Sequence, residues 1–279
     1  MSLWYDETFH GHTRLGLLSK ETLFSAQSPY QKIEVIDTVG FGRVLIIDNV
    51  FMTSEYDEFL YHEMLAHPAL TTAPRIERVL VIGGGDGGTV REVLRHPDVK
   101  ECVMIEIDEM VVDTSKRFLP GIGTAWDDPR LDVRFIDGTE YVQMSTDAPF
   151  DVILLDGTDP VGPGAVLFDE RFYAGCKRML APAGVMALQS ESPLLMMDIF
   201  VEIQHKLRNL FSEVHPYLGP VPLYGTGTWS WTWCSNTGEP LRPIHERQQA
   251  IVEGSKAYNE DLHQAMFALP NYVKRALKL

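Results

Sequence analysis

An alternation of short apolar segments with helical ones, beginning near residue 78, limits the fold of this chain more than any other feature. Residues 79–82, 103–105, 133–136 and 151–155 are mainly apolar, and each is followed by a segment of helical character. Strands joined by helices run parallel, and the strands of a sheet covered on both faces are short and apolar. The pattern therefore predicts an α/β fold with a mostly parallel, doubly wound sheet.

The C-terminal part of the chain extends this sheet. Residues 185–188 predict a fifth strand, and two further β-like stretches lie near Val214 and over residues 228–234. Because no long helix separates the last two stretches, we expect them to close the sheet as antiparallel strands. After Pro240 the pattern is helical to the end.

The N-terminal segment predicts a small antiparallel β-domain. Polar and apolar residues alternate over residues 31–37, which is typical of a half-buried strand, and residues 43–47 form a second apolar strand. Asp48 and Asn49 follow at the point where a tight hairpin turn needs positive φ.

A helix is expected from Glu55 to His67, with Ser54 as its N-cap and with Pro68 and Pro74 ending it. We place a domain boundary near residue 70. Residues 1–70 then form the β-domain with a linking helix, and residues 71–279 form the α/β domain with the C-terminal helices.

The charge and cysteine content limit the partners and the compartment. Thirty-nine Asp and Glu against 24 Lys and Arg give a net charge of −15, which phosphate repels, so we expect no nucleic-acid partner. We expect no membrane span and no export signal, because no apolar run approaches about 18 to 20 residues and the first residues lack a basic segment. Cys102, Cys176 and Cys234 share no metal-ligand spacing, so we expect reduced thiols, a cytoplasmic location and no metal site.

Acidic residues stand where the predicted parallel strands end. Glu106, Asp137 and Asp156 follow three strands directly, and Asp86 lies in the glycine-rich loop 83–88 after the first. In an open α/β sheet, ligands bind beyond the carboxyl ends of the strands. We therefore expect these four carboxylates along one crevice. A nucleoside bound there would place its ribose hydroxyls where Glu106 can accept hydrogen bonds from them.

The glycine loop admits two ligand classes. Gly83, Gly85 and Gly88 satisfy the dinucleotide pattern GxGxxG. However, a carboxylate at a helix N-terminus opposes the binding of a pyrophosphate, whereas it suits a cation, so Asp86 favours a positively charged nucleoside such as S-adenosylmethionine or a relative. Asp86 could instead cap the following helix, and the two roles are compatible.

A second pair of carboxylates, Asp156 and Asp159, lies on a loop that contains two prolines. Such a pair can hold an ammonium group and accept a proton from it, and clustering of like charges raises the pKa of one carboxylate. The alternative is an ordinary turn with solvated aspartates.

Five motifs, spread over essentially the whole chain, carry a family resemblance. They are DEFLYHEM at 57–64, VIGGGDGGTVREV at 81–93, DGTDPVGP at 156–163, Tyr258-Asn259 and AMFALP at 265–270. Together they resemble the spermidine synthases, the polyamine aminopropyltransferases. The resemblance implies a methyltransferase-like Rossmann domain behind the β-domain, and a homodimer or homotetramer.

The resemblance also implies a reaction: transfer of the aminopropyl group of decarboxylated S-adenosylmethionine to a diamine, usually putrescine, with release of methylthioadenosine. The donor is then a co-substrate, and no cofactor is implied. By resemblance, Asp156 takes the proton of the attacking amine and Asp86 holds the aminopropyl ammonium. The acceptor amine would contact His62, Asp159, Tyr224 and Trp229, and the thioadenosine part would contact Gln31, Gly83, Gly85, Glu106, Asp137, Gly138 and Pro163.

Departures from the family pattern fall mostly on the acceptor side. Gly225 replaces the proline that usually follows the tyrosine of the segment 222–230, and Gly157 stands where Ser or Cys is usual. Cadaverine, spermidine and agmatine are therefore alternative acceptors. An S-adenosylmethionine-dependent methyltransferase and a catalytically silent polyamine-binding protein are the alternative functions.

Overall fold

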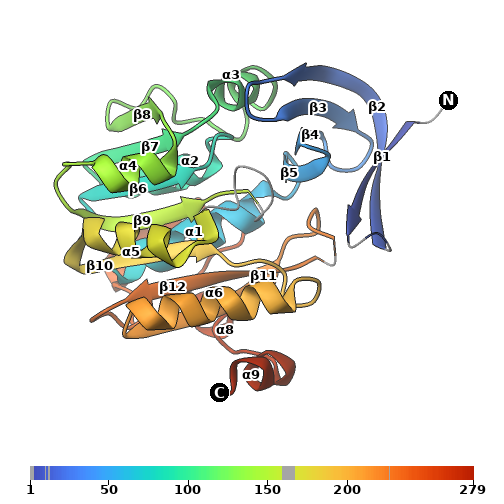
Figure 1. The fold of residues 1–279 in the computed structure, drawn as a ribbon. Coiled ribbons are helices and arrows are strands. Elements are labelled where there is room, and N and C mark those ends of the chain that lie inside the picture. The colour runs from blue at the N-terminus through green and yellow to red at the C-terminus, as the bar shows by residue number, and fades with distance from the viewer. Residues whose placement is uncertain (1–2, 10, 12, 159–166, 226) are drawn as a thin grey trace.

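The computed structural model describes residues 3–9, 11, 13–158, 167–225 and 227–279. Within these residues the chain forms two sheets, and Figure 1 shows the N-terminal one beside the end of the larger, helix-covered one. No helix among the described residues reaches the length and apolar character that crossing a membrane requires.

The N-terminal sheet confirms the predicted antiparallel β-domain. Its five strands pair in chain order, and Asp48 and Asn49 make the β4–β5 turn with φ of 48° and 67°. One face of this sheet packs against Val111, Leu119 and Ile122, which lie in and after helix α3 (Glu109–Phe118), and the other face packs against Leu223. The strands are β1 (Leu3–Phe9), β2 (Thr13–Gln27), β3 (Lys32–Thr38), β4 (Arg43–Ile47) and β5 (Val50–Ser54).

The second sheet confirms the predicted α/β fold. Its order is β11-β12-β10-β9-β6-β7-β8. The strands from β10 to β8 pair in parallel, whereas β12 pairs antiparallel with both β10 and β11, so antiparallel pairing closes the sheet as predicted. The strands are β6 (Arg78–Gly83), β7 (Glu101–Glu106), β8 (Leu131–Phe135), β9 (Phe150–Asp156), β10 (Leu180–Gln189), β11 (Glu213–Pro220) and β12 (Thr228–Ser235).

Helices cover both faces of this sheet because alternate residues of each strand point to opposite faces. Val79 and Val81 pack on the side of α1 and α2, whereas Leu80 and Ile82 pack on the side of α4, α5 and α6. The helices are α1 (Glu58–Thr72), α2 (Gly88–Leu94), α3 (Glu109–Phe118), α4 (Gly138–Met144), α5 (Glu170–Met179), α6 (Met197–Leu210), α7 (His245–Val252), α8 (Glu260–Ala265) and α9 (Asn271–Leu277).

The prediction for helix α1 was wrong at both ends. The helix begins at Glu58 with Asp57 as its N-cap. Ser54 instead stabilises the turn that precedes the helix: its hydroxyl donates to the Asp57 carboxylate at 2.6 Å and accepts the N–H of Asp57 at 3.3 Å. The helix also continues through Pro68 to Thr72. Proline removes the N–H that would bond the carbonyl of Met64, but the Tyr217 hydroxyl donates to that carbonyl at 2.8 Å. A tertiary contact thus replaces the missing helical hydrogen bond.

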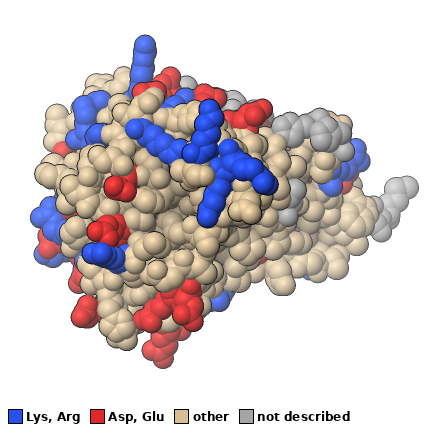
Figure 2. All heavy atoms as spheres, turned by 90° about the horizontal axis from the view of Figure 1, so that it is seen from below, with Lys and Arg blue, Asp and Glu red and all other residues tan. Residues whose placement is uncertain are grey.

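The acidic excess is not spread evenly over the surface. Figure 2 shows a group of Lys and Arg side chains near the middle of the face seen from below, with Asp and Glu side chains around it.

Candidate active site

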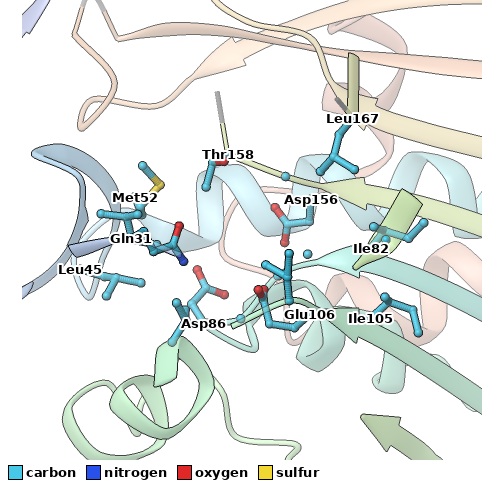
Figure 3. Close-up of a pocket in the computed structure, with 18 of the residues that line it drawn as sticks. Gln31, Leu45, Met52, Ile82, Asp86, Ile105, Glu106, Asp156, Thr158 and Leu167 are labelled. Atoms are coloured by element: carbon cyan, nitrogen blue, oxygen red, sulfur yellow. The ribbon is translucent and has the colours of Figure 1, made fainter. Parts of the chain in front are cut away.

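A cavity of about 350 Å³ lies where the carboxyl ends of β6, β7 and β9 meet the N-terminal sheet. Apolar side chains from both sheets line part of it, and carboxylates line the rest. Figure 3 shows Asp86, Glu106 and Asp156 pointing toward a common space, with Gln31, Leu45 and Met52 approaching from the N-terminal sheet. The predicted crevice with four strand-end carboxylates is therefore present, since Asp137 also lines the cavity.

The glycine loop allows polar side chains of the site to approach its backbone closely. A Cβ on Gly84 would lie 2.9 Å from Asp156 Oδ2, and a Cβ on Gly85 would lie 2.9 Å from Glu106 Oε2. A Cβ on Gly88 would lie 2.2 Å from the His62 ring. Each of these glycines thus makes room for one polar side chain of the site.

The two carboxylates at the centre of the cavity have different surroundings. Asp86 Oδ1 accepts the N–H of Gly88 at 2.8 Å, and Asp86 Oδ2 lies 3.2 Å from His62 Nε2. Burial alone would raise the pKa of Asp86, but the cationic His62 and these hydrogen bonds hold it below the ordinary value. Asp86 thus bonds Gly88, the first residue of α2, although Gly87 and not Asp86 is the N-cap of the helix, and Asp86 remains ionised.

Asp156 shows the opposite behaviour. Its Oδ2 accepts the Thr89 hydroxyl at 2.6 Å, yet burial and the nearby charge of Asp86 raise the pKa of Asp156 above the ordinary value. A pair of carboxylates with pKa values displaced in opposite directions is typical of sites in which one carboxylate moves a proton and the other stays charged.

Glu106, at the end of β7, is the third carboxylate. It is buried, its Oε1 accepts the N–H of Asp108 at 3.0 Å, and burial raises its pKa to about 7. Gln31 crosses from the N-terminal sheet to the same region, where its amide donates to Asp108 Oδ2 at 3.1 Å. Hydrogen-bond acceptors and a carboxamide therefore meet beside apolar walls, an arrangement suited to a nucleoside.

Asp137 and Gly138 begin helix α4 at the edge of the cavity. Asp137 Oδ1 caps the helix by accepting from Thr139 N at 2.7 Å and from the Thr139 hydroxyl at 2.6 Å. A Cβ on Gly138 would lie 2.8 Å from Ile82, so the glycine allows the helix to begin against the strand.

A second, smaller cavity adjoins the first. The two share Met52, Tyr61, Gly157, Thr158 and Tyr224 in their walls. The Tyr224 hydroxyl donates to the carbonyl of Met52 at 2.5 Å, and the Tyr224 ring lies edge-on to Trp229 with 4.7 Å between centroids. Aromatic side chains therefore line the region where the two cavities meet, and the two cavities together are called the channel.

Two further buried carboxylates line the smaller cavity and do not line the larger one: Glu7 from β1 and Glu191 after β10. Glu191 has φ of 69°, in the left-handed region that is uncommon for a glutamate. The Gln189 side chain and the Ser230 hydroxyl fix this backbone, with hydrogen bonds of 3.0 Å to Glu191 N and 2.6 Å to Glu191 O. Backbone strain that neighbouring groups hold in place is often found at functional sites.

The structure brings together nearly all of the residues that the sequence predicted for the site. Those that line one or both cavities are Gln31, His62, Gly83, Gly85, Asp86, Glu106, Asp137, Gly138, Asp156, Tyr224 and Trp229. Asp159 and Pro163 lie outside the described residues. Sequence reasoning missed Glu7 and Glu191, whose positions in β1 and after β10 carry no motif, and Tyr61, whose only signal is its place beside His62 in the motif 57–64.

The site combines a pocket, carboxylates suited to cationic groups, and a carboxylate with a raised pKa. Among the described residues that line the pocket there is no Lys or Arg. Within the described part of the chain, no three His, Cys, Asp or Glu side chains are grouped to hold a metal ion. Fold and site together define an enzyme with a methyltransferase-like Rossmann core, whose ligands bind at the carboxyl ends of the strands.

Comparison with known proteins agrees with this class. The model of the spermine/spermidine synthase domain matches residues 58–242, and that of the spermidine synthase tetramerisation domain matches residues 3–55. The chain belongs to the spermine/spermidine synthase family, and it is an enzyme of the polyamine aminopropyltransferase type.

Individual relatives match over nearly their full length. A polyamine aminopropyltransferase of Prochlorococcus marinus is 44% identical over 98% of this chain and 96% of the relative, and one of Bacillus subtilis is 38% identical over 99% of each. A solved spermidine synthase in complex with the transition-state analogue AdoDATO has a TM-score of 0.95 and 37% identity, covering 99% of this chain and 95% of that one. The spermidine synthase of Thermotoga maritima has a TM-score of 0.94 and 37% identity, covering 99% and 94%.

Proposed function

We propose that this enzyme transfers the aminopropyl group of decarboxylated S-adenosylmethionine to putrescine, giving spermidine and methylthioadenosine. The observation that carries the proposal is the meeting of Asp86 and Asp156 in one cavity with pKa values displaced in opposite directions. The donor acts as a co-substrate, and the proposal assigns no role to a cofactor or a metal.

The donor fits the larger cavity. Its adenosine would lie against the apolar walls, with Gln31, Glu106 and Asp137 as polar partners and Gly83, Gly85 and Gly138 allowing close approach. Its aminopropyl ammonium would pair with ionised Asp86. Intact S-adenosylmethionine carries a carboxylate that Asp86 would repel, which disfavours the methyltransferase alternative.

The acceptor fits the smaller cavity. Its reacting nitrogen would lie near Asp156, its methylenes would pass Tyr224 and Trp229, and its far ammonium would be held by Glu7 and Glu191. A carboxylate at each end of an aromatic channel matches a diamine better than a monoamine. Asp159 belongs to the amine-binding set predicted from the sequence, and Pro163 belongs to the set for thioadenosine. His62 was predicted with the amine-binding set, but its ring nitrogens face Asp86 and Glu58.

The chemical step requires alignment and the removal of one proton. The amine nitrogen attacks the methylene next to sulfur, a C–N bond forms, and the C–S electron pair returns to sulfur to give a neutral thioether. The nitrogen arrives as an ammonium and gives one proton to Asp156 as it attacks, which frees the lone pair for the new bond, and it leaves as the secondary ammonium of the product. Because the sulfonium is already a good leaving group, holding the two reactants in line supplies much of the acceleration.

We further propose a cytoplasmic homodimer or homotetramer. Three buried, unpaired cysteines fit a reducing compartment, and the N-terminal sheet is the region that matches a tetramerisation domain. Leu3 and Trp4 on its edge strand are more than half exposed, which suits an interface between copies.

The release of methylthioadenosine by the purified enzyme tests the proposal. Decarboxylated S-adenosylmethionine is paired separately with putrescine, cadaverine, spermidine, agmatine and the monoamine butylamine, with intact S-adenosylmethionine as control donor. We expect release that depends on the decarboxylated donor and is fastest with putrescine. Faster release with another amine would reassign the acceptor, and methyl transfer from intact S-adenosylmethionine would overturn the proposal. Binding without release would support a silent polyamine-binding protein.

A further inference from the structure

Asp86 is the first of four side chains with alternating charge that lie in a row leading away from the cavity. Asp86 Oδ2 is 3.2 Å from His62 Nε2, and His62 Nδ1 is 2.7 Å from Glu58 Oε2. The guanidinium of Arg91 donates to the Glu58 carboxylate at 2.7 and 3.1 Å. The row, from the cavity outward, is Asp86, His62, Glu58 and Arg91.

Both nitrogens of the His62 ring face a carboxylate oxygen. Ionised carboxylates only accept hydrogen bonds, so both ring nitrogens must carry hydrogen and the ring must be an imidazolium. Glu58 accepts hydrogen bonds from two nitrogens of the Arg91 guanidinium, which keeps its carboxylate ionised. Asp86 accepts the N–H of Gly88 on one oxygen and faces His62 with the other, so it is ionised as well. A ring with both nitrogens committed in this way has no nitrogen left for the acceptor amine.

The surroundings make this pairing strong. The exposed fractions of the side chains of His62 and Glu58 are 2% and 4%, so water screens their interaction little. Burial alone would lower the pKa of His62, yet Asp86 and Glu58 raise it well above the ordinary value. Burial would raise the pKa of Glu58, yet His62 and Arg91 lower it.

The backbone is shaped for the ring as well. A Cβ on Gly88 would lie 2.2 Å from His62 Cε1 and 2.3 Å from Nδ1, so the imidazole is seated directly on the first residue of α2. Arg91, one turn further along α2, reaches Glu58 on α1 and also donates to the carbonyl of Ile122 at 2.9 Å. Helix α2 therefore supports the row at two points.

We propose that Glu58 is a positioning residue, which holds His62 as a doubly protonated ring and thereby fixes the Asp86 carboxylate in the orientation that receives the donor's ammonium. His62 then acts on the substrate through Asp86 and not through a hydrogen bond of its own to the acceptor amine. The inference deepens the proposed function and rests on its assignment of Asp86 to the aminopropyl ammonium.

The protonation of His62 can be measured without any reaction. In ¹⁵N-histidine-labelled, ligand-free protein, we expect one imidazole to remain doubly protonated at pH 8.5, and its signal to be missing in His62→Gln. The charged or titratable groups that face His62 are Glu58 and Tyr61 of α1, Arg91 of α2, Asp86 of the glycine loop and Asp156 of β9. A His62 ring that is neutral at pH 7 in the wild-type protein would overturn the inference.

Ligand binding separates positioning from general damage. Glu58→Gln removes the charge but keeps the shape, so we expect the Kd of decarboxylated S-adenosylmethionine to rise tenfold or more. Methylthioadenosine lacks the ammonium, and its Kd should change by less than about threefold. The loss for the donor should grow as pH rises, because His62 without Glu58 gives up its proton more readily. Equal losses for both ligands at every pH would contradict the positioning role.

Glu63→Gln is the matched control. Glu63 is a buried carboxylate on the same helix, but it accepts backbone N–H groups of Lys256, Ala257 and Tyr258 and does not contact His62. We expect this variant to lower the melting temperature while the His62 signal and the two Kd values stay unchanged. If the wild-type enzyme transfers aminopropyl groups while His62 is neutral, the inference fails and the proposed function stands. If His62 is doubly protonated and no transfer occurs, the proposed function fails and the row itself stands.

Discussion

Gly85 lies so close to the carboxylate of Glu106 that a Cβ at this position would be 2.9 Å from Oε2 and 2.7 Å from Val111 Cγ1. The backbone of Gly85 is not in the left-handed region, so the glycine serves the close approach and not an unusual φ. The glycine loop of this enzyme is thus a place where side chains of the site reach the backbone.

We expect Gly85→Ala to weaken the binding of methylthioadenosine at least tenfold, because the methyl group displaces Glu106 from the cavity wall. Titration calorimetry would measure the change. Gly121→Ala is the control, since a Cβ on Gly121 meets nothing within 4 Å and its effect on binding should be negligible. Unchanged affinity in Gly85→Ala would mean that Glu106 does not contact the ligand.

We expect Glu106→Gln to stabilise the ligand-free protein at pH 8 while it weakens nucleoside binding. Burial raises the pKa of Glu106 to about 7, from 4.5 in an unfolded chain. The folded state then retains a proton that the unfolded state has lost, so stability falls as pH rises from 4.5 to 7 and the loss is complete above 7. At about 1.4 kcal/mol per pKa unit, the loss at pH 8 is about 3 kcal/mol.

Thermal melts of Glu106→Gln and wild type at two pH values check this expectation. The variant should melt several degrees higher at pH 8, since about 1 kcal/mol corresponds to about 2 to 4 °C in a chain of this size. Near pH 4.5 the two proteins should melt together. A variant that melts lower at pH 8 would show that the Glu106 carboxylate is stabilised by its partners more than burial opposes it.

We expect Asp156→Asn to lower kcat by about 10²- to 10⁴-fold, which is the usual contribution of a general base. Donor and acceptor should still bind, because Asn keeps an oxygen for the Thr89 hydroxyl that Asp156 accepts at 2.6 Å. Single-turnover kinetics and equilibrium binding would separate the two effects. Full activity in this variant would rule out Asp156 as the base.

The pH dependence gives an independent test of the same base. Because burial and Asp86 raise the pKa of Asp156, the carboxylate loses its proton later than an ordinary aspartate as pH rises. The acceptor amine, with a pKa near that of lysine at about 10.4, must also lose a proton. We therefore expect kcat/KM to rise across neutrality, and a flat profile from pH 6 to 9 would contradict a rate limited by proton removal.

We expect Glu191→Gln to raise the KM for putrescine about 10- to 100-fold, the range that corresponds to the about 1.5–3 kcal/mol of a hydrogen bond to a charged group. The kcat at saturating amine should change little, because Glu191 lines the smaller cavity and Asp156 lines the larger one. Butylamine lacks the second ammonium, so its KM should be the same in both enzymes. A similar increase for butylamine would show that the substitution alters the channel and not the recognition of the far amine.

The strands of both sheets were predictable because burial on one or both faces imposes a period of two on the residues. Val79, Leu80, Val81 and Ile82 illustrate this, since alternate members pack into the two separate cores. Helix α1 was predicted poorly because its length depends on a partner far away in the sequence. A proline inside a helical pattern usually ends the helix. Here the Tyr217 hydroxyl donates to the carbonyl that Pro68 leaves without an N–H, and the helix continues.

The fold class, the crevice at the strand ends and the carboxylates Asp86, Glu106 and Asp156 could be predicted from the order of residues alone, because each carboxylate follows a buried apolar strand, directly or in the loop after it. The surroundings of those carboxylates could not be predicted in this way. The opposite pKa displacements of Asp86 and Asp156 depend on which side chains are buried beside each one. The joining of Glu7 and Glu191 at one end of a channel depends on how the N-terminal sheet packs against the larger one. Burial and proximity act through space, and residues distant in the chain supply both.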